Sequence, residues 1–339
     1  MTGAAEEICR CAAGIDGEVA ADALFERCYD RFLALRAILR QWTPNTLRSM
    51  RRVGRLVCQF APHLRVGEID REWLAEFCRY QHTHCLRPRR GDAPAAGYSN
   101  PVIRKNCSVL KSFLRWLADR GALERRVAEG WVPVLKTVRR PVIFLSCDEL
   151  ARFLAVEVRE GSPMQRARDI FAFGCFTGLR YSDMMNLRKT DVKSDSLQLT
   201  TIKTCAPLRI ELNVHSRRIL ERYAGLPGER ALPHMDGAQL NLYIKKVAEA
   251  AGIDDPLTIT QYYGCERREV TQPKHALLSC HAARRTFICT ALALGIPPDV
   301  IMKWTGHSDY AAMRPYIDIA DATRRTSMSR FDTLRLDPA

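Results

Sequence analysis

Six side chains that suit phosphate chemistry occur in order along the second half of the chain. They are Arg180, Lys203, His281, Arg284, His307 and Tyr316. Cutting a phosphodiester without a metal requires a nucleophile, cations for the charge on the non-bridging oxygens, and an acid for the departing oxygen. Arginine suits the oxygens because its planar fork makes two charge-assisted hydrogen bonds and stays charged. A phenol suits the nucleophile because a neighbouring base or cation can activate it. The sequence therefore contains each part of such a reaction.

Local patterns place several of these side chains at defined points of the backbone. The run TGLR follows a predicted helix and puts Arg180 on a turn, with Asp183 three residues later. Lys203 falls near the tip of a predicted β-hairpin, where apolar residues alternate on both sides of a turn. His281 and Arg284 are three residues apart, so on a helix both side chains lie on one face and can reach one phosphate.

In this order, the arginine turn, the hairpin lysine, His-x-x-Arg, Thr-Gly-His and a tyrosine resemble the C-terminal signature of the tyrosine recombinases. This integrase family cuts and rejoins DNA through a phosphotyrosine, and the two-domain, Xer-like members are the nearest in character. The resemblance implies that Arg180 and Arg284 hold the scissile phosphate and that Asp183 supports the backbone around Arg180. Lys203 becomes the general acid to the 5′ oxygen and His281 a proton-transfer partner.

The same resemblance assigns the last two positions. His307 would hold a non-bridging oxygen, and Tyr316, nine residues later, would be the nucleophile. Tyr310 is a decoy at a position where the family has an apolar residue that packs the helix. Pro315 departs from the usual pattern, because a proline disfavours helical geometry at the residue before it and can kink the helix that carries Tyr316.

The composition is that of a globular protein with a polyanionic partner. Of 339 residues, 47% are hydrophobic and 27% are charged, which excludes disorder as an account of the whole chain. The 52 Lys and Arg against 38 Asp and Glu give a formal net charge of +14. A basic excess of this size favours binding to nucleic acid, because neutralising phosphates releases condensed counterions. Charge alone leaves an unrelated basic enzyme open.

The sequence gives no sign of a membrane or secreted protein. No apolar run reaches the roughly 18 residues that a membrane span needs, and the N-terminus lacks a basic region followed by an apolar core. The 13 cysteines follow no disulfide spacing, so we expect reduced core thiols in a cytoplasmic protein. His82, His84 and Cys85 cluster, but no second cluster lies at zinc spacing, so we expect no metal and no cofactor.

Residues 1–21 are predicted to be a loose lead-in, and residues 22–135 a helical DNA-binding domain. Apolar residues there recur at three- and four-residue intervals. Ser99 or Asn100 before Pro101 is a good N-cap for one helix. The candidate DNA contacts are exposed basic positions on two of these helices: Arg48, Arg51, Arg52, Arg55, Arg104 and Lys105. A basic, proline-containing linker is expected over 136–145.

Residues 146–339 are predicted to form the catalytic domain and its C-terminal tail. Ser146 and Glu149 make a capping box at the start of this domain. Helices and one hairpin follow, and 257–273 is predicted to be irregular and partly strand-like. Apolar residues in the tail, such as Phe331 and Leu334, suggest docking on a neighbouring subunit or folding back on their own domain.

The resemblance also implies the architecture and the partners. The fold class is mainly α, with an all-helical core-binding domain and an α+β catalytic domain that carries a small antiparallel sheet, together a C-shaped clamp on double-stranded DNA. It implies a homo-tetramer on paired DNA sites, a monomer free in solution, an accessory directionality factor, and a bacterial, nucleoid-associated, cytoplasmic location. A topoisomerase of type IB, a non-catalytic DNA-binding regulator on this fold, and an unrelated basic enzyme remain as alternatives.

Overall fold

The computed structural model describes residues 17–84, 97–129, 131 and 133–320, and the side chains as far as residue 317. Grouping by contacts divides the chain into two compact units. Unit 1 comprises Met1–Arg139 together with Thr260–Glu269, and unit 2 comprises Arg140–Ile259 together with Val270–Ala339. Each unit is described by itself. The domain limits, the loose lead-in and the clamp stay predictions, and so does the tail, since 1–16 and 321–339 lie outside the described residues.

Unit 1 is built from helices, as the periodicity predicts. These are α2 (Phe25–Arg40), α3 (Pro44–Phe60), the 3₁₀ turn η1 (Val66–Glu68), α4 (Arg71–Thr83), α5 (Asn100–Ala118) and α6 (Arg125–Glu129). Aromatic rings of α2 and α5 form the centre of the core. Phe25 and Phe113 meet edge to face with ring centroids 5.2 Å apart, an arrangement that aromatic quadrupoles favour.

Two helix starts in unit 1 differ in their chemistry. Asp70 caps α4 by accepting a hydrogen bond from the Trp73 amide at 2.7 Å, as an N-cap carboxylate does. At α5 the predicted side-chain cap is wrong, because Ser99 makes no cap hydrogen bond. Asn100 lies inside the helix, and its amide instead bonds to the turn at Gly264: the Gly264 N–H donates to Asn100 Oδ1 at 2.7 Å, and Asn100 Nδ2 donates to the Gly264 carbonyl at 2.9 Å.

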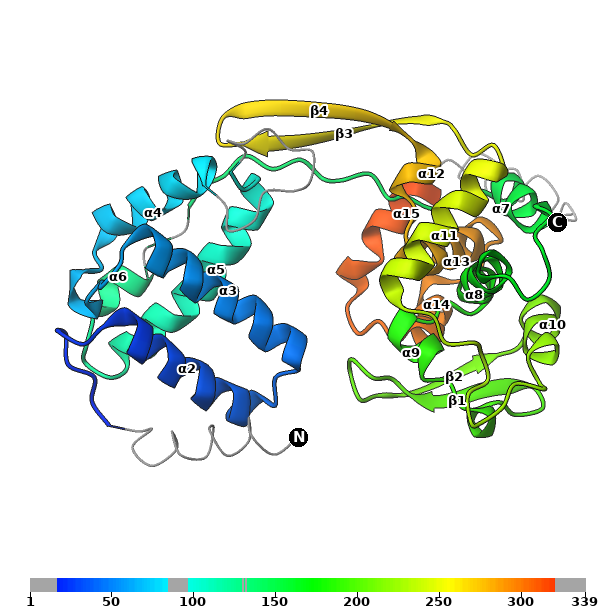
Figure 1. Cartoon of the computed structure of the whole chain (residues 1–339), viewed down its shortest axis with the longest axis horizontal. Helices are drawn as coiled ribbons and strands as arrows, with labels where there is room; N and C mark the ends of the chain where they lie inside the picture. Colours follow the sequence, from blue (N-terminus) through cyan, green and yellow to red (C-terminus); the bar gives the residue numbers. More distant parts are fainter. Residues whose placement is uncertain (1–16, 85–96, 130, 132, 321–339) are drawn as a thin grey trace, which may run out of the picture. The chain divides into compact units, whose positions relative to one another are not determined.

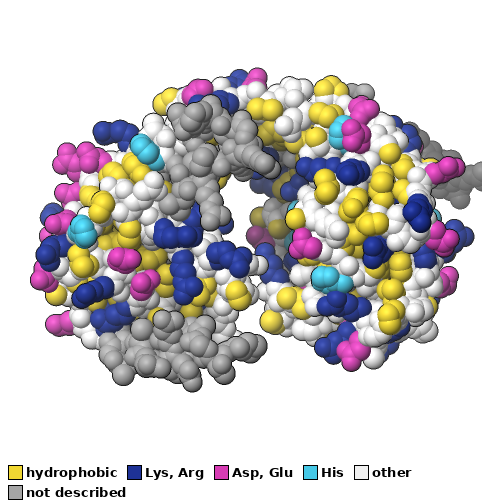
Figure 2. All heavy atoms as spheres, in the orientation of Figure 1, with side chains coloured by type: hydrophobic (Ala, Val, Ile, Leu, Met, Phe, Trp, Pro, Cys, Tyr) yellow, Lys and Arg dark blue, Asp and Glu magenta, His cyan; other side chains and the backbone are white. Residues whose placement is uncertain are grey.

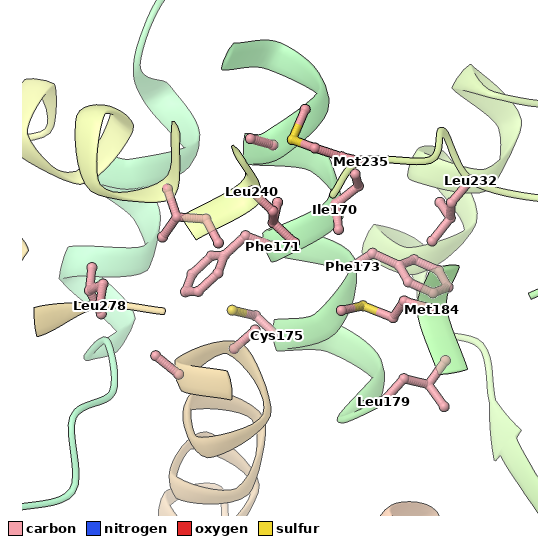
Figure 3. Close-up of a cluster of buried hydrophobic side chains, with 14 of the residues drawn as sticks. Ile170, Phe171, Phe173, Cys175, Leu179, Met184, Leu232, Met235, Leu240 and Leu278 are labelled. Atoms are coloured by element: carbon pink, nitrogen blue, oxygen red, sulfur yellow. The ribbon is translucent and has the colours of Figure 1, made fainter. Parts of the chain in front are cut away.

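Unit 2 begins with α7 (Cys147–Ala155), α8 (Pro163–Thr177), α9 (Tyr181–Met185) and the 3₁₀ turn η2 (Lys189–Asp191). The predicted capping box is confirmed: the Glu149 amide donates to Ser146 Oγ and the Ser146 amide donates to the Glu149 carboxylate. Helix α8 is the centre of the unit. Its side chains are buried all round, which is typical of a core helix, and Figure 3 shows Phe171 and Phe173 among apolar residues from other elements.

The predicted hairpin is confirmed as β1 (Ser196–Thr200) and β2 (Pro207–Glu211), which pair antiparallel. The pair Leu197–Ile210 directs its side chains into the core, whereas Gln198 and Arg209 pair on the opposite face. The remaining helices are α10 (Val214–Arg222), α11 (Gly237–Ala250), α12 (Lys274–Leu277), α13 (Cys280–Ala293), α14 (Pro298–Thr305) and α15 (Arg314–Ala320), with the 3₁₀ turn η3 (Tyr310–Ala312) between the last two.

The region predicted to be irregular and partly strand-like is a second hairpin, β3 (Pro256–Tyr263) and β4 (Glu266–Pro273). A two-residue turn at Gly264 and Cys265 closes it, and Gly264 has a φ of +62°, which favours glycine. Nearly all of β4 is exposed, so its sequence shows no alternation of buried and polar residues. The fold class is confirmed: a helical unit and a mainly helical unit with small two-stranded sheets.

Ten cysteines lie among the described residues, and all are free thiols. The prediction of core positions is wrong for Cys147, Cys205 and Cys265, whose side chains are exposed. The described residues contain no group of three or more potential metal ligands. Cys85 lies outside them, so the absence of a metal stays a prediction. No described helix is long and apolar enough to span a membrane.

Candidate active site

The turn between α8 and α9 positions Arg180. Helix α8 ends at Gly178, which has a φ of +68°. A β-carbon there would also lie 2.5 Å from the Phe287 ring, so both the backbone angle and the space require glycine. Leu179 is buried and anchors the turn. Arg180 is the N-cap of α9 and has an extended backbone, and its Nη1 atom is buried without a hydrogen-bond partner among the described residues.

Asp183 connects this turn to the loop that carries Lys203. Its side chain is buried, and Oδ1 accepts a hydrogen bond from the Ile202 amide at 2.9 Å. Oδ2 has no partner within the described residues. The resemblance implied that Asp183 supports the backbone around Arg180. In the structure its side chain instead accepts a hydrogen bond from Ile202, the residue before Lys203. The carboxylate therefore links the loop that carries Lys203 to the turn that carries Arg180.

Lys203 lies on the loop between β1 and β2. The base of the loop is closed by Thr201, whose amide donates to the Ala206 carbonyl at 2.9 Å and whose hydroxyl lies 2.6 Å from that of Thr204. The Lys203 side chain is exposed. The base of the loop is therefore fixed while the ammonium group at its tip remains accessible.

Helix α13 supplies His281 and Arg284. Arg284 is only 3% exposed, and its guanidinium makes three contacts. Nη1 donates to the Gly178 carbonyl at 2.8 Å, whereas Nη2 donates to the Thr305 carbonyl and lies 3.2 Å from His307 Nε2. A guanidinium has five N–H donors, so these contacts leave two for a ligand.

His307 follows the end of α14. Gly306 ends this helix with a φ of +61°, and the His307 amide donates to the Met302 carbonyl at 3.1 Å. The imidazole lies between two groups, with Nδ1 2.9 Å from the Thr305 hydroxyl and Nε2 beside Arg284. The Trp304 indole N–H donates to the Glu211 carboxylate at 2.6 Å, which attaches α14 to β2 and hence to the lysine hairpin.

Tyr316 is carried by α15, which packs against α13. Its half-buried ring lies against a small apolar cluster that includes Ile288, Ile301 and Met313. Pro315 falls in the first turn of α15, where a missing N–H removes no helical hydrogen bond, so the expected disturbance of the helix is absent. Tyr310 lies in η3 and is 57% exposed, so it does not pack as the resemblance implied.

Positive charge is in excess around His281, Arg284 and His307, and together burial and this charge lower the pKa of each of them. Desolvation lowers the pKa of His281 to about 4, with further lowering by Arg285, Arg284, Arg180 and Lys203, although the residue itself is exposed to solvent. Desolvation, then Arg284, Arg180 and His281, lower the pKa of His307 to about 4. Both imidazoles are therefore neutral at pH 7.

The pKa of Arg284 is lowered by burial and by the same neighbouring positive charge. Burial, together with the charge of Arg180, lowers the pKa of its guanidinium to about 10, while Tyr316 and Asp183 raise it in part. These mutual effects show that Arg180, Lys203, His281, Arg284, His307 and Tyr316 share one electrostatic neighbourhood in unit 2. Asp183 is the one carboxylate among these effects, so the cations outnumber it and favour a bound anion.

The predicted DNA contacts lie on α3 and α5 of unit 1, and Figure 2 shows a group of Lys and Arg side chains over α3. Five of the six are exposed: Arg48, Arg51, Arg55, Arg104 and Lys105. Arg52 is half-buried, and its Nη2 donates to Asn106 Oδ1 at 2.9 Å. The Arg52 guanidinium therefore already has a hydrogen-bond partner within unit 1, unlike a side chain that only faces solvent.

Sequence reasoning missed three groups that organise the cluster. The Gly178 carbonyl and the Thr305 carbonyl both hold Arg284. Backbone acceptors carry no sequence signal, although the glycine beside a predicted helix end was visible. The Thr305 hydroxyl was also missed, because the sequence does not reveal that it faces the ring of His307.

No protein-family model matches the sequence, and no curated protein matches it. Solved structures do match. A lambda integrase dimer bound to a COC′ core site aligns with a TM-score of 0.64 and 16% identity, over 86% of this chain and 94% of that one. The same integrase, as a tetramer bound to a Holliday junction, aligns with a TM-score of 0.62 and 15% identity, over 85% and 78%.

Two further proteins align in the same way. The Tn1549 transposon integrase in complex with circular intermediate DNA has a TM-score of 0.62 and 16% identity, over 86% of this chain and 94% of that one. XerH recombinase bound to a palindromic difH substrate has a TM-score of 0.61 and 14% identity, over 85% and 80%. At such identities the likeness shows the fold alone. The chain has the tyrosine recombinase fold, as the sequence predicted.

Proposed function

We propose that this protein is a site-specific DNA recombinase that cleaves and rejoins strands through a 3′-phosphotyrosine, with Tyr316 as the nucleophile. The observation that carries the proposal is the cluster in unit 2. An Arg180 nitrogen without a partner among the described residues, two spare donors on Arg284 and two neutral imidazoles share one neighbourhood with excess positive charge. A phosphodiester supplies the missing negative charge, and the phenol of Tyr316 is close enough to influence Arg284.

The reaction assigns each group a step. Arg180, Arg284 and His307 bind the non-bridging oxygens of the scissile phosphate and stabilise the charge that grows on them. The Tyr316 oxygen attacks phosphorus and loses its proton, with His281 as the neighbouring acceptor. The bond to the 5′ oxygen breaks, and Lys203 donates the proton that makes the 5′-hydroxyl. A 5′-hydroxyl of a partner strand then attacks the phosphotyrosine. Bond energy is conserved, so the reaction consumes no nucleotide.

The proposal extends to the assembly and to the biological role. Four copies on two paired DNA sites exchange strands in two rounds through a Holliday junction, the DNA species bound by the lambda integrase tetramer that this chain resembles. Exposed arginines of α3 and the basic residues of α5 contact phosphates of double-stranded DNA. We place the protein in the bacterial cytoplasm on DNA, acting in DNA integration for a mobile genetic element, with an accessory factor that sets direction.

The test begins with the DNA site. Duplexes that bind the protein are selected from a random-sequence library, and a nick is then placed beside each candidate scissile phosphate so that the cleaved strand end diffuses away. Wild-type protein is expected to form a covalent adduct that resists denaturing electrophoresis. Tyr316→Phe, which removes only the phenol oxygen, is expected to abolish the adduct. Tyr310→Phe is the matched control and is expected to retain it.

Other outcomes identify the alternatives. An adduct accompanied by relaxation of supercoiled plasmid, with no strand exchange between two sites, would indicate a topoisomerase of type IB. Specific binding with no adduct would indicate a non-catalytic regulator. An adduct that persists in Tyr316→Phe and disappears in Tyr310→Phe would contradict the assignment of the nucleophile.

A further inference from the structure

The Thr305 side chain is fully buried at the end of α14 and contacts the ring of His307. Its Oγ1 atom lies 2.6 Å from the Ile301 carbonyl oxygen, 3.4 Å from the Met302 carbonyl oxygen and 2.9 Å from His307 Nδ1. A threonine hydroxyl has one hydrogen to donate. A carbonyl oxygen can only accept, so the hydroxyl hydrogen points to the helix carbonyls, and the 2.6 Å contact with Ile301 is the shorter one.

This arrangement fixes the position of the proton on His307. Because the hydroxyl hydrogen is already used, the contact with Nδ1 requires that Nδ1 carries a hydrogen and donates it to Oγ1. The other ring nitrogen agrees. Nε2 lies 3.2 Å from Arg284 Nη2, and a guanidinium can only donate, so Nε2 presents its lone pair. Both contacts therefore select the same neutral tautomer, with Nδ1 protonated.

This tautomer decides whether His307 can donate a hydrogen bond to a phosphate. Nε2 in this tautomer is an acceptor, and it cannot donate to a phosphate oxygen unless the ring gains a second proton. The charged and titratable groups that act on His307 are Arg284, Arg180 and His281, which keep the ring neutral in the free protein. Arg285 and Lys203 act on His281 in turn. Tyr316 and Asp183 act on Arg284. A bound phosphate offsets the cations and favours the imidazolium.

We propose that Thr305 is a positioning residue that keeps the proton of His307 on Nδ1, so that binding of the scissile phosphate is coupled to uptake of one proton from solvent at Nε2. The bond that forms is Nε2–H, and the hydrogen bond from Arg284 Nη2 to Nε2 breaks, which frees that donor for the phosphate. The imidazolium then donates from Nε2 to a non-bridging oxygen, while Nδ1–H still donates to Thr305. This inference rests on the proposed function for its second half, whereas the tautomer is a property of the free protein.

The first measurement is made on the free protein. Histidine labelled with ¹⁵N gives separate signals for protonated and unprotonated ring nitrogens, and His307→Gln identifies the His307 pair among the eight histidines. The expected result at pH 7 is a protonated Nδ1 and an unprotonated Nε2. Thr305→Ser keeps the hydroxyl and is expected to retain this tautomer, whereas Thr305→Val keeps the shape without the acceptor and is expected to raise the Nε2–H population. Wild-type protein with Nε2 protonated overturns the inference.

The second measurement follows adduct formation on the selected nicked duplex as a function of pH, with DNA affinity measured separately. Thr305→Val is expected to bind DNA within about twofold of wild type and to cleave about tenfold or more slowly, with its pH optimum moved to lower pH. Cleavage slows because the ring is no longer held at Nδ1, and the pH optimum moves because a neutral imidazole without the Thr305 acceptor takes up its second proton less readily. Thr305→Ser is expected to restore both rate and optimum.

The outcomes separate the two proposals. If Thr305→Val matches wild type in rate and pH optimum, the coupling to phosphate binding is wrong. The same holds if Thr305→Ser is as defective as Thr305→Val, because the hydroxyl is then not the active group. If wild-type protein shows the expected tautomer but forms no adduct with any selected duplex, the proposed function fails while the position of the proton stands. Thermal unfolding of both variants identifies a result caused by misfolding.

Discussion

Replacing Gly178 with alanine tests the turn that aims Arg180 and holds Arg284. Gly178 has a φ of +68°, where an L-residue costs about 1–2 kcal/mol. The added β-carbon would lie 2.5 Å from a Phe287 ring atom, closer than a real contact allows, and overpacking of this kind costs about 1–3 kcal/mol. We therefore expect Gly178→Ala to lower the free energy of unfolding of unit 2 by about 2–5 kcal/mol.

The chain offers a matched control for the backbone part of this cost. Gly161 has the same φ of +68°, and a β-carbon there would meet nothing within 4 Å. Gly161→Ala is therefore expected to cost only about 1–2 kcal/mol. Urea denaturation gives each free energy, and hydrogen exchange of peptides from α8 assigns the transition to unit 2. In a Phe287→Ala background, Gly178→Ala should cost no more than Gly161→Ala, because the ring is gone.

Two results would refute this reasoning. Equal costs for Gly178→Ala and Gly161→Ala would show that the Phe287 ring yields freely, so that space does not require glycine at this turn. A cost of Gly178→Ala that is unchanged by Phe287→Ala would place the strain elsewhere. The carbonyl of Gly178 holds Arg284, so we also expect Gly178→Ala to reduce adduct formation beyond its effect on folding.

Three further predictions concern pH, the lysine loop and the DNA interface. The pKa of His307 is lowered to about 4 in the folded protein, so its contribution to stability is fully present above pH 6.5 and is lost as the pH falls toward 4. A shift of this size corresponds to about 3 kcal/mol at most, which we reduce to about 1–2 because the ring is half-buried. Urea denaturation at pH 7 and pH 5 should therefore show a smaller loss for His307→Gln than for wild type, and an equal loss would contradict the shift. Asp183→Ala removes the acceptor of the Ile202 amide, and we expect adduct formation to be about 100-fold slower while DNA affinity is unchanged. Adding Lys203→Ala to Asp183→Ala should slow adduct formation little further, because the loop that carries Lys203 is already misplaced. Arg51→Ala should reduce the slope of log affinity against log salt by about 1, measured by fluorescence anisotropy on any duplex, and an unchanged slope would exclude Arg51 from the interface.

The sequence predicted those elements in which the spacing of apolar residues matches the side of the element that is buried in the core. Helix α8 reads as apolar through Ile170 and Phe171 and is buried on all sides, and β1 and β2 alternate because one face of the hairpin packs on the core. The region of the hairpin β3–β4 was predicted only as irregular and partly strand-like, for the opposite reason. Its second strand is exposed almost throughout, so burial imposes no pattern on its residues.

The candidate site follows the same division. The six side chains with phosphate chemistry were visible from type and order, and the structure brings them into one electrostatic neighbourhood. The groups that orient them were not visible, because they depend on long-range contacts. Asp183 reaches across 19 residues to the Ile202 amide, and Arg284 is held by backbone carbonyls that any residue could provide.

The hairpin turn at Gly264 has a practical consequence for dividing the protein into fragments. The polypeptide enters unit 1 twice, first with Met1–Arg139 and again with Thr260–Glu269, where Gly264 exchanges two hydrogen bonds with Asn100. A fragment that starts at residue 140 therefore carries residues 260–269 without the unit that they pack against. A fragment that ends at residue 139 lacks the same residues and leaves the Asn100 side chain without its partner Gly264. Shortening the hairpin at residues 260–269 gives the C-terminal fragment a cleaner boundary than a single cut between Arg139 and Arg140.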